Sequence, residues 1–213
     1  MNEITGKQLA EMIGQMAEAI VAKCDDLNRL DSALGDGDHG TGISTAFAEA
    51  ARLANDLAAP SPPEVLRTTS QALMNRMGGA SGALFGIIFL KASTAVKGKA
   101  TLNRDDMVAM WTAGLEGVMS RGHAQPGDKT MVDALHPAVE AFTKTADWDS
   151  AFADAARAAA DGAQATTKMV AKHGRAKFTG ERALGHVDAG AMSVAIMFAA
   201  MDKYWRDAGN GET

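Results

Sequence analysis

The sequence has a single cysteine and few aromatic residues, and each shortage narrows what the protein can be. Its 213 residues include 1 Cys, 1 Tyr, 3 Trp and 5 Pro. Because Cys24 has no second cysteine to pair with, the chain cannot form an internal disulfide, which fits a reducing cytoplasm. The apolar content of 46% is that of an ordinary globular protein, so we expect a sizeable hydrophobic core.

Basic segments and long apolar runs are also missing. The formal net charge is −5 and no basic stripe follows any segment, so neither nucleic acid nor a membrane surface is an expected partner. No run approaches the roughly 18 apolar residues of a membrane span. The amino-terminal residues lack the basic stretch and apolar run of a signal peptide. We therefore expect a cytoplasmic protein.

Helical periodicity dominates the chain, and no convincing strand alternation is found. Thr5 and Gln8 have the spacing of a capping box, and Asn103 is suited to cap a helix. Pro137 is expected to kink or split the helix that contains it. Helices are expected at about residues 9–27, 43–57, 65–77, 83–96, 104–120, 130–145, 148–172 and 189–207.

Short connections between these helices predict antiparallel neighbours. No linker rich in Gly, Ser or Pro divides the chain, so residues 1–213 are expected to form one domain. The predicted fold is all-α, an eight-helix antiparallel barrel or bundle.

Glycine is concentrated in four segments, residues 35–42, 78–86, 114–127 and 174–190. Glycines at helix junctions allow the backbone to approach a ligand closely, often a phosphate. Ordinary helix capping is the alternative.

The first glycine-rich segment carries carboxylates that predict a metal site. Asp36 and Asp38 are two residues apart, and the glycines between and before them would let them converge with Asp31. A divalent cation would relieve their repulsion, and oxygen ligands suit magnesium or calcium. The EF-hand pattern fails because no Glu stands at its closing position. Magnesium is therefore predicted; the alternative is a solvated acidic turn in which Asp38 caps a helix.

Neighbouring segments are suited to anions. The segment from His39 to Gly42 begins a helix, where free N–H groups and the helix dipole attract phosphate, and His39 could donate to a phosphate oxygen. A second helix start follows Gly78, with Ser81 placed to cap or to bind phosphate. The long last segment supplies cations that could face phosphates or simply lie in solvent: Arg175, Lys177 and Arg182.

One phosphate-loop pattern is rejected. The segment from Gly122 to Thr130 resembles a Walker loop, but Asp128 interrupts the required Gly-Lys-Thr order and no strand precedes it. We interpret it as a connection into the next helix, with Met131 free to pack on a flat ring.

Taken in order, these motifs resemble the nucleotide-binding L subunit of dihydroxyacetone kinases over nearly the whole chain. The resemblance implies an eight-helix barrel with the nucleotide in the loops at one end. The residues that carry it are Asp31 with Gly35-Asp36-Gly37-Asp38-His39-Gly40, Gly78-Gly79-Ala80-Ser81-Gly82, Pro126-Gly127-Asp128-Lys129-Thr130-Met131, Gly174-Arg175-Ala176 and Gly185-His186-Val187-Asp188-Ala189-Gly190.

The resemblance also implies residue roles. It places Arg175 among the lid contacts as the catalytic residue, with Lys177 and Arg182 left open as alternatives for the key lid cation, and Ala189 stands where the family commonly has proline. The implied magnesium ligands, for a pair of Mg²⁺ ions, are Asp31, Asp36 and Asp38; the implied nucleotide contacts are His39, Gly40, Thr41, Gly42, Ala80, Ser81, Gly122, Met131, Arg175, Asp188, Ala189 and Gly190.

The implied activity is phosphoryl transfer to a ketose, dihydroxyacetone, held by a separate K subunit. In one form ADP stays bound and is recharged by a phosphocarrier protein of the phosphotransferase system. Two alternatives share every motif: an ATP-dependent kinase subunit for another small ketose such as a tetrulose, and a non-catalytic nucleotide-sensing subunit. The resemblance further implies a homodimer or a complex with the K subunit.

Overall fold

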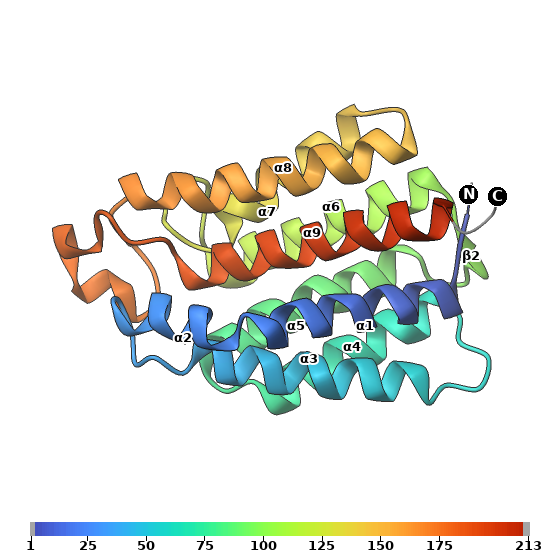
Figure 1. Cartoon of the computed structure of the whole chain (residues 1–213), viewed down its shortest axis with the longest axis horizontal. Helices are drawn as coiled ribbons and strands as arrows, with labels where there is room; N and C mark the ends of the chain where they lie inside the picture. Colours follow the sequence, from blue (N-terminus) through green and yellow to red (C-terminus); the bar gives the residue numbers. More distant parts are fainter. Residues whose placement is uncertain (1–2, 211–213) are drawn as a thin grey trace.

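Long helices run back and forth along one axis in the computed structural model, which describes residues 3–210 (Figure 1). Within those residues one short pair of strands, β1 (Ile4–Thr5) and β2 (Thr101–Leu102), pairs antiparallel. The helices are α1 (Gly6–Ala22), α2 (Cys24–Ser32), α3 (His39–Asn55), α4 (Pro62–Arg76), α5 (Gly79–Ala95), α6 (Arg104–Gly122), α7 (Val132–Lys144), α8 (Trp148–Ala165) and α9 (Ala189–Asn210), with short 3-10 turns η1 (Thr166–Lys168), η2 (Arg175–Phe178) and η3 (Gly180–Ala183).

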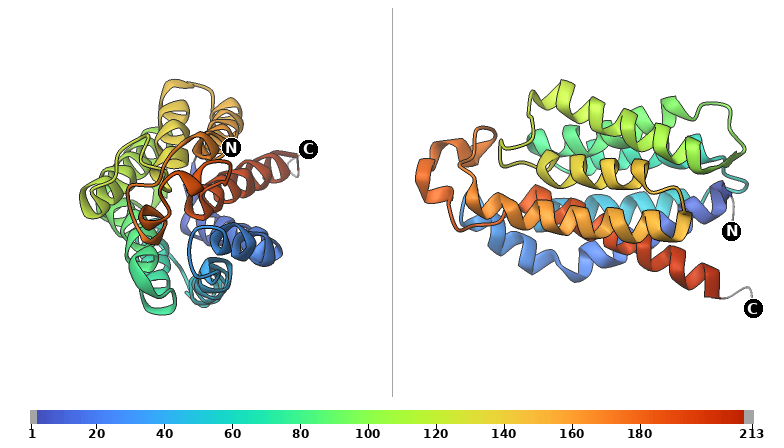
Figure 2. Two further views of the ribbon diagram at one scale, coloured as in Figure 1. Left: turned by 90° about the vertical axis from the view of Figure 1, so that its left-hand side faces the viewer. Right: turned by 90° about the horizontal axis from the view of Figure 1, so that it is seen from above.

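Eight of these helices close into a ring. From α3 to α9 each packs against the next along the chain, and α1 packs against both α3 and α9 (Figure 2). The predicted all-α, eight-helix antiparallel architecture is therefore confirmed. No helix within residues 3–210 is long and apolar enough to cross a membrane.

The helix starts follow from the sequence. Thr5 and Gln8 form the predicted capping box, with the Gln8 amide donating to Thr5 Oγ1 at 3.2 Å and the Thr5 amide to Gln8 Oε1 at 2.9 Å. Asn103 caps α6 in the same way. Each cap satisfies amides that the first helical turn leaves unpaired, and so fixes where the helix begins.

Aromatic side chains join the helices in the interior. Trp111 of α6 lies 6.4 Å from Phe89 of α5 and 4.9 Å from Phe198 of α9 between ring centroids. All three are nearly fully buried. Burial of such rings stabilises a helical bundle more than helix propensity does, so these contacts hold the ring of helices together.

The structure corrects two helix boundaries and excludes a split at Pro137. The first predicted helix breaks at Lys23, whose ψ of 12° starts the separate α2. The seventh predicted helix, 148–172, ends at Ala165, where the chain tightens into the 3-10 turn η1. Pro137 does not split its helix, because α7 is continuous. Pro137 has no N–H to donate to the Asp133 carbonyl, and Gly162 allows α8 to approach that carbonyl closely.

Because the helices alternate in direction, alternate connections share an end. Residues 33–38, 77–78, 123–131 and 166–188 lie at the left-hand end in Figure 1. All four glycine-rich segments reach this end, which we call the glycine-rich end. The fold thus gathers segments far apart in sequence into one place.

Candidate functional site

Three carboxylates converge at the glycine-rich end. Asp31 stands near the end of α2, and Asp36 and Asp38 lie in the connection to α3. One oxygen from each lies within 4.8 Å of the others. An all-oxygen set at this spacing fits the ligands of a hard divalent cation such as Mg²⁺. Asp38 is the N-cap residue of α3, as in the alternative reading, but its side chain makes no capping hydrogen bond to the helix.

Asp31 also shapes the loop that carries its partners. Its Oδ2 accepts hydrogen bonds from the amides of Gly37 at 2.8 Å and Asp38 at 3.1 Å. Gly37 has a φ of +78°, which L side chains rarely adopt. A Cβ at Gly35 would lie 2.5 Å from Asp31 Oδ1. The glycines are therefore needed for this acidic loop to fold back onto Asp31.

Residues 167–187, which include most of the last glycine-rich segment, lie against the acidic loop. We call them the lid segment. Arg175 pairs with Asp36. Leu34, beside the acidic loop, packs with Ala171 and Ala183 of the lid segment. The other predicted cations stay within the segment: Lys177 lies over the Phe178 ring and Arg182 bonds the Thr179 carbonyl. Arg175 is thus the lid cation that reaches the acidic loop.

His39 makes its side-chain contacts inside the bundle. Its ring is buried, with Nε2 2.8 Å from Ser193 Oγ of α9 and the ring centroid 6.1 Å from that of Phe85. Burial lowers the pKa of His39, although Asp31 and Asp38 act in the opposite direction. The buried ring is thus bonded to α9 within the bundle, while the His39 amide donates to Asp31 Oδ2 at 3.4 Å.

The two helix starts differ in how open they are. At α3 the His39 amide already donates to Asp31 Oδ2 at 3.4 Å and the Thr41 amide to Asn28 Oδ1 at 3.0 Å. At α5, within the described part of the chain, the amides of Gly79, Ala80 and Ser81 donate to no protein acceptor. The start of α5 is therefore the more open anion site.

Met131 meets the predicted lid contacts Asp188, Ala189 and Gly190 at the start of α9. A Cβ at Gly190 would lie 3.5 Å from that of Met131, and Asp188 Oδ2 accepts the Ala191 amide at 2.8 Å. Ala189 is buried beside them. Met131 is only 5% exposed, and most of its side chain packs into the core beside Gly190. Gly122 lies against Leu84 of α5.

We expect Asp188→Asn to flatten the pH dependence of stability. Burial raises the pKa of Asp188 from 3.8 to about 6. Because the folded value is higher than the unfolded one, the wild type should lose stability as the pH rises from about 4 to about 6. Thermal unfolding across this range should show a fall in Tm, on the order of 5 °C, that the variant lacks. Asp207→Asn, on the exposed face of α9, should behave as the wild type. If the Tm of Asp188→Asn fell with pH as the wild-type Tm does, the raised pKa of Asp188 would not be the cause.

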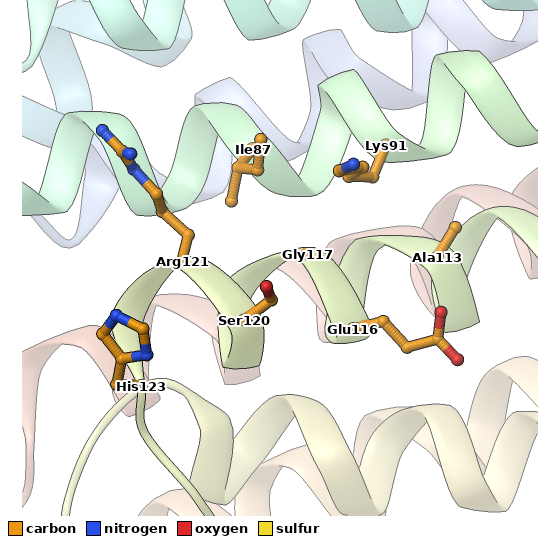
Figure 3. A pocket seen from close by; sticks show the side chains of 8 residues that line it. All are labelled: Ile87, Lys91, Ala113, Glu116, Gly117, Ser120, Arg121 and His123. Atoms are coloured by element: carbon orange, nitrogen blue, oxygen red, sulfur yellow. The ribbon is translucent and has the colours of Figure 1, made fainter.

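Two grooves lie outside this cluster. One, of about 620 Å³, runs between α5 and α6 and contains none of the predicted site residues (Figure 3). The other, of about 480 Å³, lies between α2 and α9 and is lined mainly by apolar side chains. The first is lined by Ile87, Lys91, Ala113, Glu116, Gly117, Ser120, Arg121 and His123, and the second by Lys23, Asp26, Leu27, Arg29, Leu30, Met192 and Ile196.

Comparison with known proteins supports a shared architecture. A family model described as the DAK2 domain matches residues 33–203. The chain is 34% identical over 194 residues to the ADP-binding subunit DhaL of the PEP-dependent dihydroxyacetone kinase of Escherichia coli (strain K12), covering 89% of this chain and 92% of that protein. It is 40% identical over 190 residues to the ADP-binding subunit DhaL of the PEP-dependent dihydroxyacetone kinase 2 of Listeria innocua, covering 85% and 87%.

The fold also matches a solved structure. The crystal structure of the dihydroxyacetone kinase from C. freundii in complex with AMP-PNP and Mg²⁺ superposes with a TM-score of 0.73 at 29% identity. The match covers 91% of this chain and 33% of that chain, so the present chain spans about a third of that kinase.

Proposed function

The chain belongs to the DAK2 domain family, and we propose that residues 1–213 form a single nucleotide-binding domain that serves as the ADP-binding subunit of a dihydroxyacetone kinase. The observation that carries the proposal is the convergence of three carboxylates within 4.8 Å at the glycine-rich end. The relatives matched over most of their length, including the E. coli subunit, are named ADP-binding subunits of such kinases.

We assign the parts of the site as follows. Asp31, Asp36 and Asp38 would hold a pair of Mg²⁺ ions, which when bound neutralise charge on phosphoryl oxygens. The amides at the start of α5, at Ala80 and Ser81, would hold phosphate oxygens. The backbone of residues 39–42 would support them, Gly122 and Met131 would flank the adenine, and Asp188, Ala189 and Gly190 would contact the nucleotide from the lid side.

The chain's own contribution to phosphoryl transfer is positioning and charge. Arg175 is placed by Asp36 at the acidic loop, where its guanidinium can stabilise charge on the transferring group. Such chemistry needs no protein nucleophile. The acceptor hydroxyl would belong to dihydroxyacetone held by a K subunit.

We propose ADP as a retained cofactor that a phosphocarrier protein of the phosphotransferase system recharges. Three relatives covered over 87% to 93% of their length are named PEP-dependent or PTS-dependent. The alternative of a kinase for another small ketose has a relative in the L-erythrulose 1-kinase of Mycolicibacterium smegmatis, at 35% identity, but the chain covers only 36% of that enzyme.

The nucleotide carried by the purified protein tests this proposal. The protein is denatured and the released nucleotide identified, and the folded protein is assayed with a K subunit and dihydroxyacetone. We expect retained ADP and turnover that requires the phosphocarrier proteins. Turnover with free ATP alone would favour the other ketose kinases, and nucleotide binding without turnover would favour a sensing subunit. Absence of nucleotide binding at any Mg²⁺ concentration would refute the phosphocarrier-dependent subunit, the ATP-dependent kinase subunit and the sensing subunit alike.

Replacing Arg175 should lower the transfer rate more than replacing either neighbouring lid cation. We expect Arg175→Ala to reduce kcat by roughly 10²- to 10³-fold, because charge stabilisation at the transferring group is lost. Lys177→Ala and Arg182→Ala are the matched controls and should change kcat by less than about threefold. The coupled ketose assay measures all three. Equal losses in the three variants would show that the lid cations act only through general charge.

A further inference from the structure

Lys129 is a buried lysine to which the proposed chemistry gives no role. It is 1% exposed although it lies in a connection between helices. Its φ of 60° is in the left-handed region, which residues other than glycine rarely occupy. A lysine kept both buried and strained is unusual, and such positions are kept only where the surroundings require them.

The ammonium group of Lys129 ties together the two ends of the lid segment. Its Nζ donates to the Thr166 carbonyl at 2.5 Å and also to the His186 carbonyl. Thr166 precedes the lid segment and His186 stands at its far end. The lysine is therefore bonded to the chain both where it enters the lid and where it leaves.

Two further hydrogen bonds join the same two ends of the lid segment, residues 166–167 and 185–188, which we call the neck. The Gly185 amide donates to the Thr167 carbonyl at 2.8 Å, and the Asp188 amide donates to Thr166 Oγ1 at 2.9 Å. Together with the two bonds from Lys129, they hold the two chain segments of the neck against each other.

The connection that carries Lys129 is itself fixed. Asp133 Oδ2 accepts the Thr130 amide at 2.8 Å, which holds the backbone just after Lys129. Burial lowers the pKa of Lys129, while the carboxylates of Asp188 and Asp133 act in the opposite direction. The ammonium charge is thus compensated by carboxylates as well as by the carbonyls that accept from it.

The residue before Lys129 attaches the body of the lid. Asp128 accepts from Lys172 Nζ at 2.7 Å and lies 3.2 Å from His173 Nε2. The hydrogen bond from Lys172 contributes most to lowering the pKa of Asp128 to about 2, so this carboxylate stays ionised at neutral pH. Adjacent residues therefore hold the neck and the body of the lid to one rigid connection.

We propose that Lys129 is a positioning residue that closes the neck of the lid segment and so sets where Arg175 and Gly190 stand relative to the acidic loop. The inference rests on the proposed function for what the lid covers, a bound nucleotide. The hydrogen bonds of the neck do not depend on that function.

Hydrogen exchange of the wild type tests the closed neck directly. We expect the amides of Gly185 and Asp188 to be protected like those of the bundle helices, because both are bonded within the neck. Exchange as fast as in exposed loop amides would overturn the proposal without any variant.

Variants then test the lysine itself. In Lys129→Met, which keeps the volume and removes the donors, the lid amides should exchange faster while those of α4 and α5 remain unchanged. Dissociation of ADP in the presence of Mg²⁺ should accelerate at least about tenfold, as expected for loss of a charge-assisted hydrogen bond. Lys129→Arg, which keeps donors and charge, should retain most of the protection. Lys203→Met, on an exposed lysine of α9, is the control and should match the wild type.

The outcomes separate the two proposals. Unchanged lid exchange in a folded Lys129→Met protein would overturn the role of Lys129. Loss of the whole bundle in both Lys129 variants would assign the residue to global stability and would also overturn it. If the wild type binds no ADP, the proposed function fails, whereas the exchange of the lid amides still reports on the neck.

Discussion

Asp36→Ala should abolish magnesium-dependent nucleotide binding, weakening the affinity for ADP by roughly a thousandfold or more. The variant removes one of three carboxylates within 4.8 Å of one another and also releases Arg175 from its partner. Titration calorimetry with Mg²⁺ and with a chelator measures the effect. Any residual affinity in the variant should no longer respond to Mg²⁺.

The fold should survive this substitution. The Asp36 side chain is 37% exposed, and Asp31 rather than Asp36 accepts the amides that shape the loop. Helical circular dichroism and Tm should therefore match the wild type. Asp56→Ala, at the opposite end of α3, is the control and should bind normally. An Asp36→Ala protein with wild-type affinity in Mg²⁺ would refute the assigned ligands.

Gly40→Ala should destabilise the protein by about 3 kcal/mol or more and impair the site together with the fold. A Cβ at this position would lie 2.0 Å from the Cys24 carbonyl oxygen and 2.9 Å from the Asn28 amide nitrogen. Both are backbone atoms of α2, so neither can move aside as a flexible side chain would. Separation of α2 from α3 would also break the hydrogen bond between Asn28 and the Thr41 amide. Urea unfolding measures the loss.

Gly14→Ala is the matched control for Gly40→Ala. Gly14 lies inside α1, and an added Cβ there meets nothing within 4 Å. Alanine has the higher helix propensity, so this variant should gain about 0.5–1 kcal/mol. Equal stability of the two variants would mean that α2 and α3 do not approach as closely as the structure has them.

Local sequence signals were sufficient for most of the architecture. The Thr5 and Asn103 caps, the apolar periodicity of the long helices and the grouping of Asp31, Asp36 and Asp38 all depend on residues close in sequence. Such features are decided by hydrogen bonds within a turn or by repulsion within one loop. The caps, the helices and the acidic group could therefore be predicted without knowing how the helices pack.

Contacts between distant segments could not be read in this way. Nothing near His39 in sequence indicates that its ring would find Ser193 of α9, and the rejected Walker pattern left Lys129 without a role. The choice of Arg175 over Lys177 and Arg182 required the lid segment to be placed over the acidic loop. The break at Lys23 depends on how α2 packs against α3, which a continuous apolar stripe does not record.

The antiparallel ring has a practical consequence for attaching other molecules. β1 and the carboxyl end of α9 both lie at the end of the bundle opposite the glycine-rich end (Figure 1). An affinity tag, a fluorescent protein or an extra domain joined at either side would therefore point away from the acidic loop and the lid. Immobilisation through such a tag should leave the loops accessible, whereas a label placed in the lid segment would sit over the carboxylates.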